Sequence, residues 1–238
     1  MRRSNRQVLE VWGDLACFSQ PPLSVERFTY PVITPSAARG IFDAIYVKPS
    51  KFRWQILEIE LFERPRYIAL RRNEMKQKAP GTDTLWRWME GREEPEPLYA
   101  DTDDEAKGRT QRQTIALKNV RYRLHAEIRP WPGYEDELAA FEAQFRRRAE
   151  QGQCAWQPYL GMREFAAYFR LVDEADRATP IPFDMEVGWM LYDVFDLSRP
   201  GTSEDKPFIT LFHARIEGGR LQVPPFESPE VKKPIPGG

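Results

Sequence analysis

The sequence has few cysteines and histidines and no long apolar run. Its 238 residues include two of each. Cys17 and Cys154 lie far apart and without metal-ligand spacing, which favours a reduced, cytoplasmic protein. No apolar stretch approaches the ~20 residues that cross a bilayer, and Gly13 and Asp14 interrupt the first one too early for a signal peptide. We therefore expect no membrane contact, no bound metal and no cofactor.

An excess of charge of either sign is also missing, since the formal net charge is −1. That value hides an asymmetry, because residues 90–105 carry eight acidic residues and one arginine. The rest of the chain is therefore positive, and arginine, whose planar fork suits phosphates, dominates its basic clusters. Such clusters are usually solvated surface, but three of them together favour a polyanionic partner. They contain Arg71 and Arg72, Arg121 and Arg123, and Arg146, Arg147 and Arg148.

The hydrophobic pattern predicts alternating strands and helices. A helix begins after Thr34, a good N-cap followed by Pro35, and ends near residues 46–48 because Pro49 disfavours helical geometry before it. A second helix spans 134–151, with acidic residues in its first turn and arginines in its last. Strands are expected at 8–18, 55–61, 119–128 and 163–172, where apolar residues alternate with polar ones or cluster.

This order predicts an α+β protein with a ferredoxin-like (RRM-like) domain, a fold whose open sheet face is a platform for RNA. We assign this domain to residues 1–179. Residues 180–238 are expected to form a small antiparallel β extension and a flexible tail. Gly218-Gly219 is a plausible tight turn between the last two strands.

Several sequence blocks resemble those of one protein family, in the same order. They are TPSAARGIFDAIYVKP (34–49), FRWQILEIELF (52–62), RRNEM (71–75), QRQTIALKNVRYRLHAEI (111–128) and FRRRAEQGQCAWQPYLGMREF (145–165). In these blocks the chain resembles the type I-C CRISPR-associated subunit of the repeat-associated RNA-binding superfamily. The resemblance extends from about residue 8 to residue 171.

The resemblance implies an endoribonuclease that cuts the precursor CRISPR transcript within each repeat, without a metal. Its partners would be the repeat RNA, the mature crRNA whose 5′ handle it keeps, and the other subunits of a type I-C effector complex. Two alternatives stay open. One is a non-catalytic scaffold that caps the 5′ handle, and the other is a role in contacting duplex DNA.

The resemblance also implies that Tyr46, at the end of the first helix, is catalytic. Metal-independent cleavage needs a base for the 2′-OH, an acid for the leaving 5′-oxygen and a cation for the phosphorane. Since the ordinary pKa of tyrosine is ~10, a phenol serving as base needs nearby positive charge, and Lys48 could supply it. The alternative is that Tyr46 simply buries its ring beneath the sheet.

One departure from the family pattern concerns a Lys-His pair near the start of the second helix. The corresponding positions are about Ala140 and Phe141, which cannot transfer protons, so other groups substitute or cleavage is weak or lost. His125 is the candidate substitute, because it shares the polar face of its strand with two arginines. The expected RNA contacts are Arg39, Arg71, Arg72, Arg121, Arg123, Arg146, Arg147 and Arg148.

Overall fold

The structure is a computed structural model that describes residues 4–21, 23, 26–102, 104, 107–173, 175–202 and 204–234. The chain forms two compact units. One comprises Met1–Ile68 with Ile115–Gly238, and the other comprises Ala69–Thr114. This division differs from the expected boundary between residues 179 and 180, because the carboxy-terminal strands join the sheet of the first unit. Each unit is described by itself.

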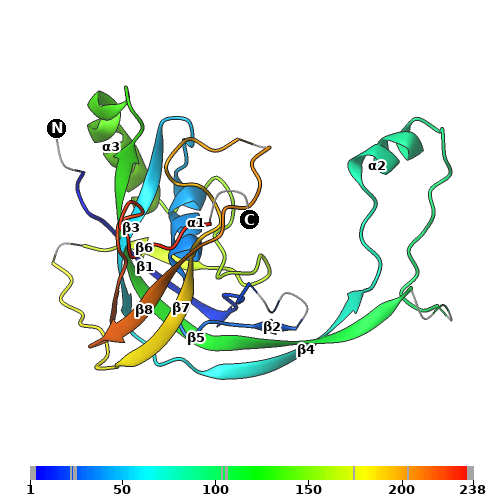
Figure 1. Cartoon of the computed structure of the whole chain (residues 1–238), viewed down its shortest axis with the longest axis horizontal. Helices are drawn as coiled ribbons and strands as arrows, with labels where there is room; N and C mark the ends of the chain where they lie inside the picture. Colours follow the sequence, from blue (N-terminus) through cyan, green and yellow to red (C-terminus); the bar gives the residue numbers. More distant parts are fainter. Residues whose placement is uncertain are drawn as a thin grey trace. The chain divides into compact units, whose positions relative to one another are not determined.

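The first unit is an α+β structure built on a large antiparallel sheet (Figure 1). The strands follow the order β6-β1-β5-β3-β9-β8-β7, and β2 pairs with β5. The first four of these, together with two helices, follow the predicted order of strand, helix, strand, strand, helix, strand. Their bounds are β1 Gln7–Ala16, β2 Arg27–Phe28, β3 Phe52–Leu61, β5 Arg109–Pro130, β6 Tyr168–Leu171, β7 Met185–Asp193, β8 Thr210–Glu217 and β9 Arg220–Gln222.

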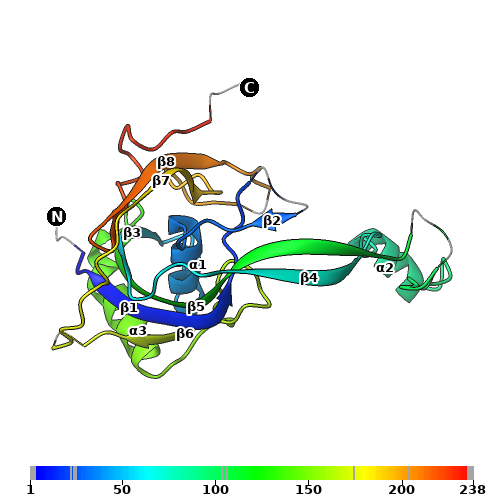
Figure 2. The ribbon, with the colours of Figure 1, turned by 90° about the horizontal axis from the view of Figure 1, so that it is seen from below.

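Helix α1 (Pro35–Ile45) forms as the sequence predicts. The Thr34 side chain accepts a hydrogen bond from the Ala37 N–H, and Pro35 occupies the first turn, where no intrahelical donor is lost. Its buried face packs through Phe42, whose ring centroid lies 4.9 Å from Trp54 on β3. Figure 2 shows α1 inside the curve of the sheet, with β7 and β8 on one side and β1 and β5 on the other.

Helix α3 (Leu138–Glu150) packs beside α1. The predicted start at residue 134 is replaced by a short 3-10 turn, η1 (Glu135–Glu137), before the α-helix begins. The Phe145 ring lies 5.5 Å from Phe42 and 4.7 Å from Trp54, so both helices cover the same face of the sheet. Among the described residues, no helix is long and apolar enough to cross a membrane.

Strand β5 separates two chemically different faces. Leu124, Ala126 and Ile128 are fully buried. They lie on the helix-covered face, since Ile128 pairs with Trp54, whose ring packs against α1 and α3. Residues 121, 123 and 125 alternate onto the other face, which confirms the predicted alternation. On β3 the alternation is interrupted, since a β-bulge between Ile56 and Glu58 leaves Leu57 without a partner on β5.

The carboxy-terminal strands extend the same sheet, because β9 pairs with β3. Gly218 and Gly219 form the predicted tight turn, with φ of 54° and 75°. A Cβ on Gly219 would lie 2.1 Å from the Ile181 carbonyl oxygen. The expectation of a flexible tail is wrong for residues 227–234, since Val231 is buried and Lys232 exchanges two backbone hydrogen bonds with Leu211. Residues 235–238 lie outside the described part.

The second unit contains most of β4 (Tyr67–Met75), the beginning of β5 and the short helix α2 (Thr82–Met89). β4 pairs with β5, and α2 buries none of its residues. The sequence analysis missed both elements. Its interpretation of the acidic segment as a loop is confirmed for residues 92–102 and 104, none of which lies in a helix or strand.

Candidate active site

The candidate site lies where α1 ends. The Tyr46 N–H still donates to the Phe42 carbonyl at 2.9 Å, but φ of −151° and ψ of 115° make Tyr46 itself extended. The side chain therefore leaves the helical surface at this residue. Its ring lies 5.4 Å from Phe52, and its carbonyl oxygen accepts a hydrogen bond of 3.0 Å from the Trp54 indole. These contacts fix the position of the ring.

The Tyr46 ring is buried, but its hydroxyl is not fully sealed. The residue is only 8% exposed, as the alternative of a packed tyrosine requires. Among the described residues the hydroxyl forms no hydrogen bond, and it keeps some exposure to solvent. The hydroxyl therefore has no partner in the described protein that a substrate would have to displace.

Three cations surround this end of α1. The Lys48 ammonium lies 5.9 Å from the centre of the Tyr46 ring and has no carboxylate partner within the described residues. The Lys51 ammonium bonds both Glu137 carboxylate oxygens at 2.9 Å, and this bond, more than the nearby phenols, raises the pKa of Lys51. Arg148 donates to the Ile45 carbonyl at 2.6 Å. A cation at a helix C-terminus offsets the negative end of the dipole.

Comparison with known proteins decides the family. Residues 8–224 match the family described as "CRISPR-associated protein (Cas_Cas5)", under the name Cas_Cas5d. The chain is 37% identical to the "CRISPR pre-crRNA endoribonuclease Cas5d" of Mannheimia succiniciproducens, covering 97% of this chain and 100% of that one. It is 35% identical to the protein of the same name from Thermus thermophilus, covering 92% and 91%. The chain belongs to the Cas5d family of CRISPR-associated proteins.

Solved structures agree with the fold of this Cas5d-family chain. One called "Crystal Structure of CRISPR-associated Protein" matches with a TM-score of 0.64 at 19% identity, over 98% of each chain. A functionally uncharacterized protein from Streptococcus mutans matches with a TM-score of 0.63 at 18% identity, over 98% of this chain and 99% of that one. The large antiparallel sheet with its helices is therefore shared with these proteins.

The place expected for the Cas5d-family Lys-His pair is apolar in this chain. Phe141 is buried, and its ring lies 5.1 Å from Phe52. Ala140 is exposed and carries no polar side chain. The Lys48 ammonium, however, lies 5.8 Å from the Phe141 ring. Lys48 thus brings a positive charge to the position where the pair is missing.

The structure does not bring His125 together with Tyr46. Tyr46 packs on Phe52, on the helix-covered face, whereas His125 lies on the opposite face of β5. A role for His125 as acid or base beside Tyr46 is therefore dropped, because the sheet separates them. The sequence located the polar face correctly, but strand alternation alone could not relate that face to the end of α1.

The His125 side chain lies next to the carboxylates of Glu58 and Glu60. Its Nε2 is 3.4 Å from Glu60, and burial, more than any neighbouring charge, lowers its pKa. His125, Glu58 and Glu60 offer ligand atoms within 4.8 Å of one another, a spacing that a metal ion could bridge. Arg6 bonds Glu58 at 2.6 Å and Arg220 lies 3.2 Å from Glu60, so both carboxylates are already paired with cations. This geometry fits an ion-pair network better than a metal centre.

Arg121 and Arg123 belong to the same network. Arg121 donates to Glu10 at 2.8 Å, and Arg123 donates to Asp176 at 2.9 Å. Arg123 is buried and Arg121 half-buried. Neither guanidinium is free as it stands, and a phosphate would have to compete with a carboxylate for either of them.

Arg39, expected to contact RNA, is paired with two carboxylates of the first unit. Its Nε and Nη2 donate to the two Asp193 carboxylate oxygens at 2.7 and 3.0 Å, and its Nη1 donates to Asp43. Burial opposes the charge of Arg39, but the two carboxylates outweigh it and raise its pKa. Arg39 therefore ties α1 to β7.

The remaining arginines differ in their surroundings. Arg146 and Arg147 are exposed on α3 and form no ion pair with the described residues. Arg148 donates a hydrogen bond from its Nε to the carbonyl of Ile45, the residue before Tyr46. Arg71 and Arg72 lie on β4 in the second unit, exposed and half-buried respectively. Of the first-unit arginines predicted to bind RNA, Arg146 and Arg147 are the two best placed to receive phosphates.

Proposed function

We propose that this Cas5d-family chain is a metal-independent endoribonuclease that cuts precursor crRNA within the repeat. Two relatives that match it over nearly their whole length are named pre-crRNA endoribonucleases. The observation that carries the proposal is the Tyr46 hydroxyl, which has no hydrogen-bond partner among the described residues and is held on a fixed ring 5.9 Å from the Lys48 ammonium, itself without a carboxylate partner among them. A phenol and an ammonium side by side supply both proton transfer and charge stabilisation.

In the proposed reaction Tyr46 acts as its phenolate and accepts the proton of the 2′-OH upstream of the scissile phosphate, which regenerates the phenol. The 2′-oxygen attacks phosphorus in line, and the 5′-oxygen leaves, which gives a 2′,3′-cyclic phosphate and a 5′-hydroxyl. Lys48 stabilises the phosphorane and gives its proton to the leaving oxygen. Arg148 assists indirectly, because its bond to Ile45 offsets the negative helix end that would oppose a phenolate.

The same chain would then hold its product as part of an RNA-guided complex. The strand order β6-β1-β5-β3 under α1 and α3 supports this proposal, because it is the order expected of a ferredoxin-like fold, which serves as a platform for RNA. We infer that Arg146 and Arg147 contact the RNA backbone. The proposed partners are the crRNA 5′ handle and the other subunits of a type I-C complex, with duplex DNA as a further contact to be tested by direct binding.

A second candidate function is a scaffold that caps the 5′ handle without cutting. It is favoured by one observation, the apolar pair Ala140 and Phe141 at the place of the family's Lys-His pair. The two functions share their RNA partner and differ only in chemistry, so a cleavage assay separates them.

The test incubates the purified protein with its own repeat RNA in EDTA. Wild type is expected to give one cut, Tyr46→Phe none, and Lys48→Gln a rate at least tenfold lower. Tyr168→Phe is the matched control, because Tyr168 is an exposed tyrosine on β6. This variant should cleave the RNA at the wild-type rate. Tight binding by wild type without any cut would support the scaffold and refute the nuclease.

A further inference from the structure

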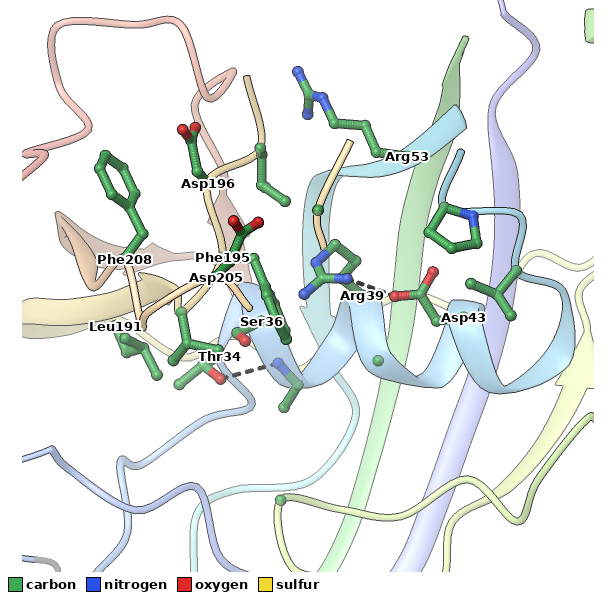
Figure 3. A pocket seen from close by; sticks show the side chains of 18 of the residues that line it. Thr34, Ser36, Arg39, Asp43, Arg53, Leu191, Phe195, Asp196, Asp205 and Phe208 are labelled. Atoms are coloured by element: carbon green, nitrogen blue, oxygen red, sulfur yellow. Dashed lines mark hydrogen bonds and ion pairs between the residues drawn. The ribbon is translucent and has the colours of Figure 1, made fainter. Parts of the chain in front are cut away.

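A cavity of about 700 Å³ lies along α1, within the range of small-ligand sites. Its lining begins with Thr34 and Ser36 at one end of the helix and reaches Val47 and Pro49 beyond the other. The cavity therefore ends next to the chain segment that carries Tyr46. Figure 3 shows α1 side chains lining it together with side chains of the segment that joins β7 to β8.

One wall of the cavity is the described part of the segment 194–208. Asp193, which bonds Arg39 on α1, also accepts hydrogen bonds of 2.8 and 3.0 Å from the Val194 and Phe195 N–H groups. Farther along, Asp205 accepts a bond of 2.8 Å from Arg199. The wall is therefore held against α1 by the protein's own contacts, before any ligand binds.

The segment 155–161 also contributes to the lining, through Trp156, Tyr159 and Gly161. The Ala155 N–H donates to the Ala44 carbonyl of α1 at 2.6 Å. Gly161, with φ of 84°, approaches β1 and its extension so closely that a Cβ would lie 2.0 Å from the Cys17 carbonyl oxygen. These two contacts hold the loop in place, and its residue Trp156 lines the cavity.

The two segments present exposed aromatic rings to the cavity. Phe195 is 55% exposed, with the Arg39 guanidinium 5.3 Å from its ring centre, and Trp156, on the other segment, is 46% exposed. Exposed aromatic rings are common on this chain, but these two also line one cavity of small-ligand size, and concave sites lined by aromatic rings bind flat apolar groups. Nucleic-acid bases are such ligands, and unpaired bases bind proteins by stacking on aromatic rings.

The charges of the cavity fit bases better than phosphates. Three guanidinium groups line it, but Arg39 is bonded to Asp193, Arg53 to Glu227 and Arg199 to Asp205. The lining also includes the carboxyl groups of Asp43 and Asp196, which repel phosphate and can accept hydrogen bonds from base amino groups. Lys206 also lines the cavity and forms no ion pair with the described residues, so the lining offers one lysine ammonium but no cluster of unpaired cations, and ring contacts would supply most of the binding.

We propose that this cavity binds unpaired bases of the repeat RNA, stacked on Phe195 and Trp156, with the RNA backbone passing toward Tyr46. This inference rests on the proposed function and names the part of the substrate that the cavity takes. It separates two surfaces, because bases enter the cavity while the exposed arginines of α3 receive the backbone.

The test measures the affinity of the full-length protein for its repeat RNA. Phe195→Ala and Trp156→Ala are each expected to weaken binding by about 5- to 150-fold, the usual value of one stacked base. Phe195→Trp should retain affinity, since any aromatic ring can stack. Trp189→Ala is the matched control, because Trp189 is 52% exposed on β7 but does not line the cavity. The slope of log affinity against log salt should stay unchanged, because stacking releases no counterions.

A second measurement locates the contact in the RNA. A 2-aminopurine is placed at successive unpaired positions, and its fluorescence should be quenched by wild type at one or two of them and recover in the Phe195→Ala and Trp156→Ala variants. If wild type binds and cuts the repeat while both variants bind as tightly, the cavity proposal is refuted and the proposed function stands. If wild type neither binds nor cuts the RNA, both fail.

Discussion

Replacing Arg39 by methionine should destabilise the first unit without removing an RNA contact. Arg39 and Asp193 are 14% and 2% exposed at their side chains, and two hydrogen bonds join them. Methionine keeps most of the aliphatic stem but leaves the Asp193 carboxylate buried without a partner. Removing one member of a buried ion pair costs about 3–5 kcal/mol, which for a unit of this size lowers Tm by roughly 6–20 °C.

The assay is thermal or urea unfolding of wild type and Arg39→Met at pH 7.5. Adding Asp193→Asn to Arg39→Met should recover part of the loss, because the carboxylate of residue 193 is then neutral, whereas Asp43, the second partner of Arg39, still lacks its cation. Arg147→Met serves as the exposed control and should stay within about 0.5 kcal/mol of wild type. The reasoning is refuted if Arg39→Met unfolds like wild type yet binds RNA more weakly with a shallower salt dependence, since Arg39 would then contact a phosphate.

Three further outcomes follow from the charges. Burial raises the pKa of Asp43 to about 6, so the contribution of Asp43 to stability is lost as pH rises from about 4 to 6, and the difference in Tm between wild type and Asp43→Asn should shift in favour of the variant over that range. Burial lowers the pKa of His125, so the unfolded chain takes up its proton first below about pH 6.5, and His125→Gln should resist acid better than wild type in the same scans. Replacing Arg146 and Arg147 together by alanine should weaken RNA binding and reduce the salt slope by about 1.4–1.8, as titrations at several salt concentrations would reveal; an unchanged slope would exclude both as phosphate contacts.

Local signals in the sequence were enough for the elements that position the site. Thr34 and Pro35 predicted the start of α1, and Pro49 predicted its end, because capping and proline geometry act within a few residues. The alternation of β5 likewise predicted which side chains share a face. These features depend on neighbours in the chain, so the sequence contains them directly.

The rest depends on contacts between distant residues. Nothing near Arg39 signals Asp193, 154 positions away, so the sequence could not reveal the ion pair that joins α1 to β7. His125 was assigned to the correct face, but its carboxylate neighbours come from β3 and follow from a register that includes a bulge. The buried Val231 was missed because its tail is rich in proline and charge, the composition of disorder.

The most direct test of the central claim is single-turnover cleavage of the cognate repeat RNA in EDTA, measured together with binding in the same samples. For wild type the account predicts one cut that leaves a 2′,3′-cyclic phosphate and is abolished by a single 2′-deoxy substitution at the cut nucleotide. For Tyr46→Phe it predicts unchanged binding and no cut. Cleavage by Tyr46→Phe at the wild-type rate would contradict the account, because the phenol oxygen would then have no part in the chemistry.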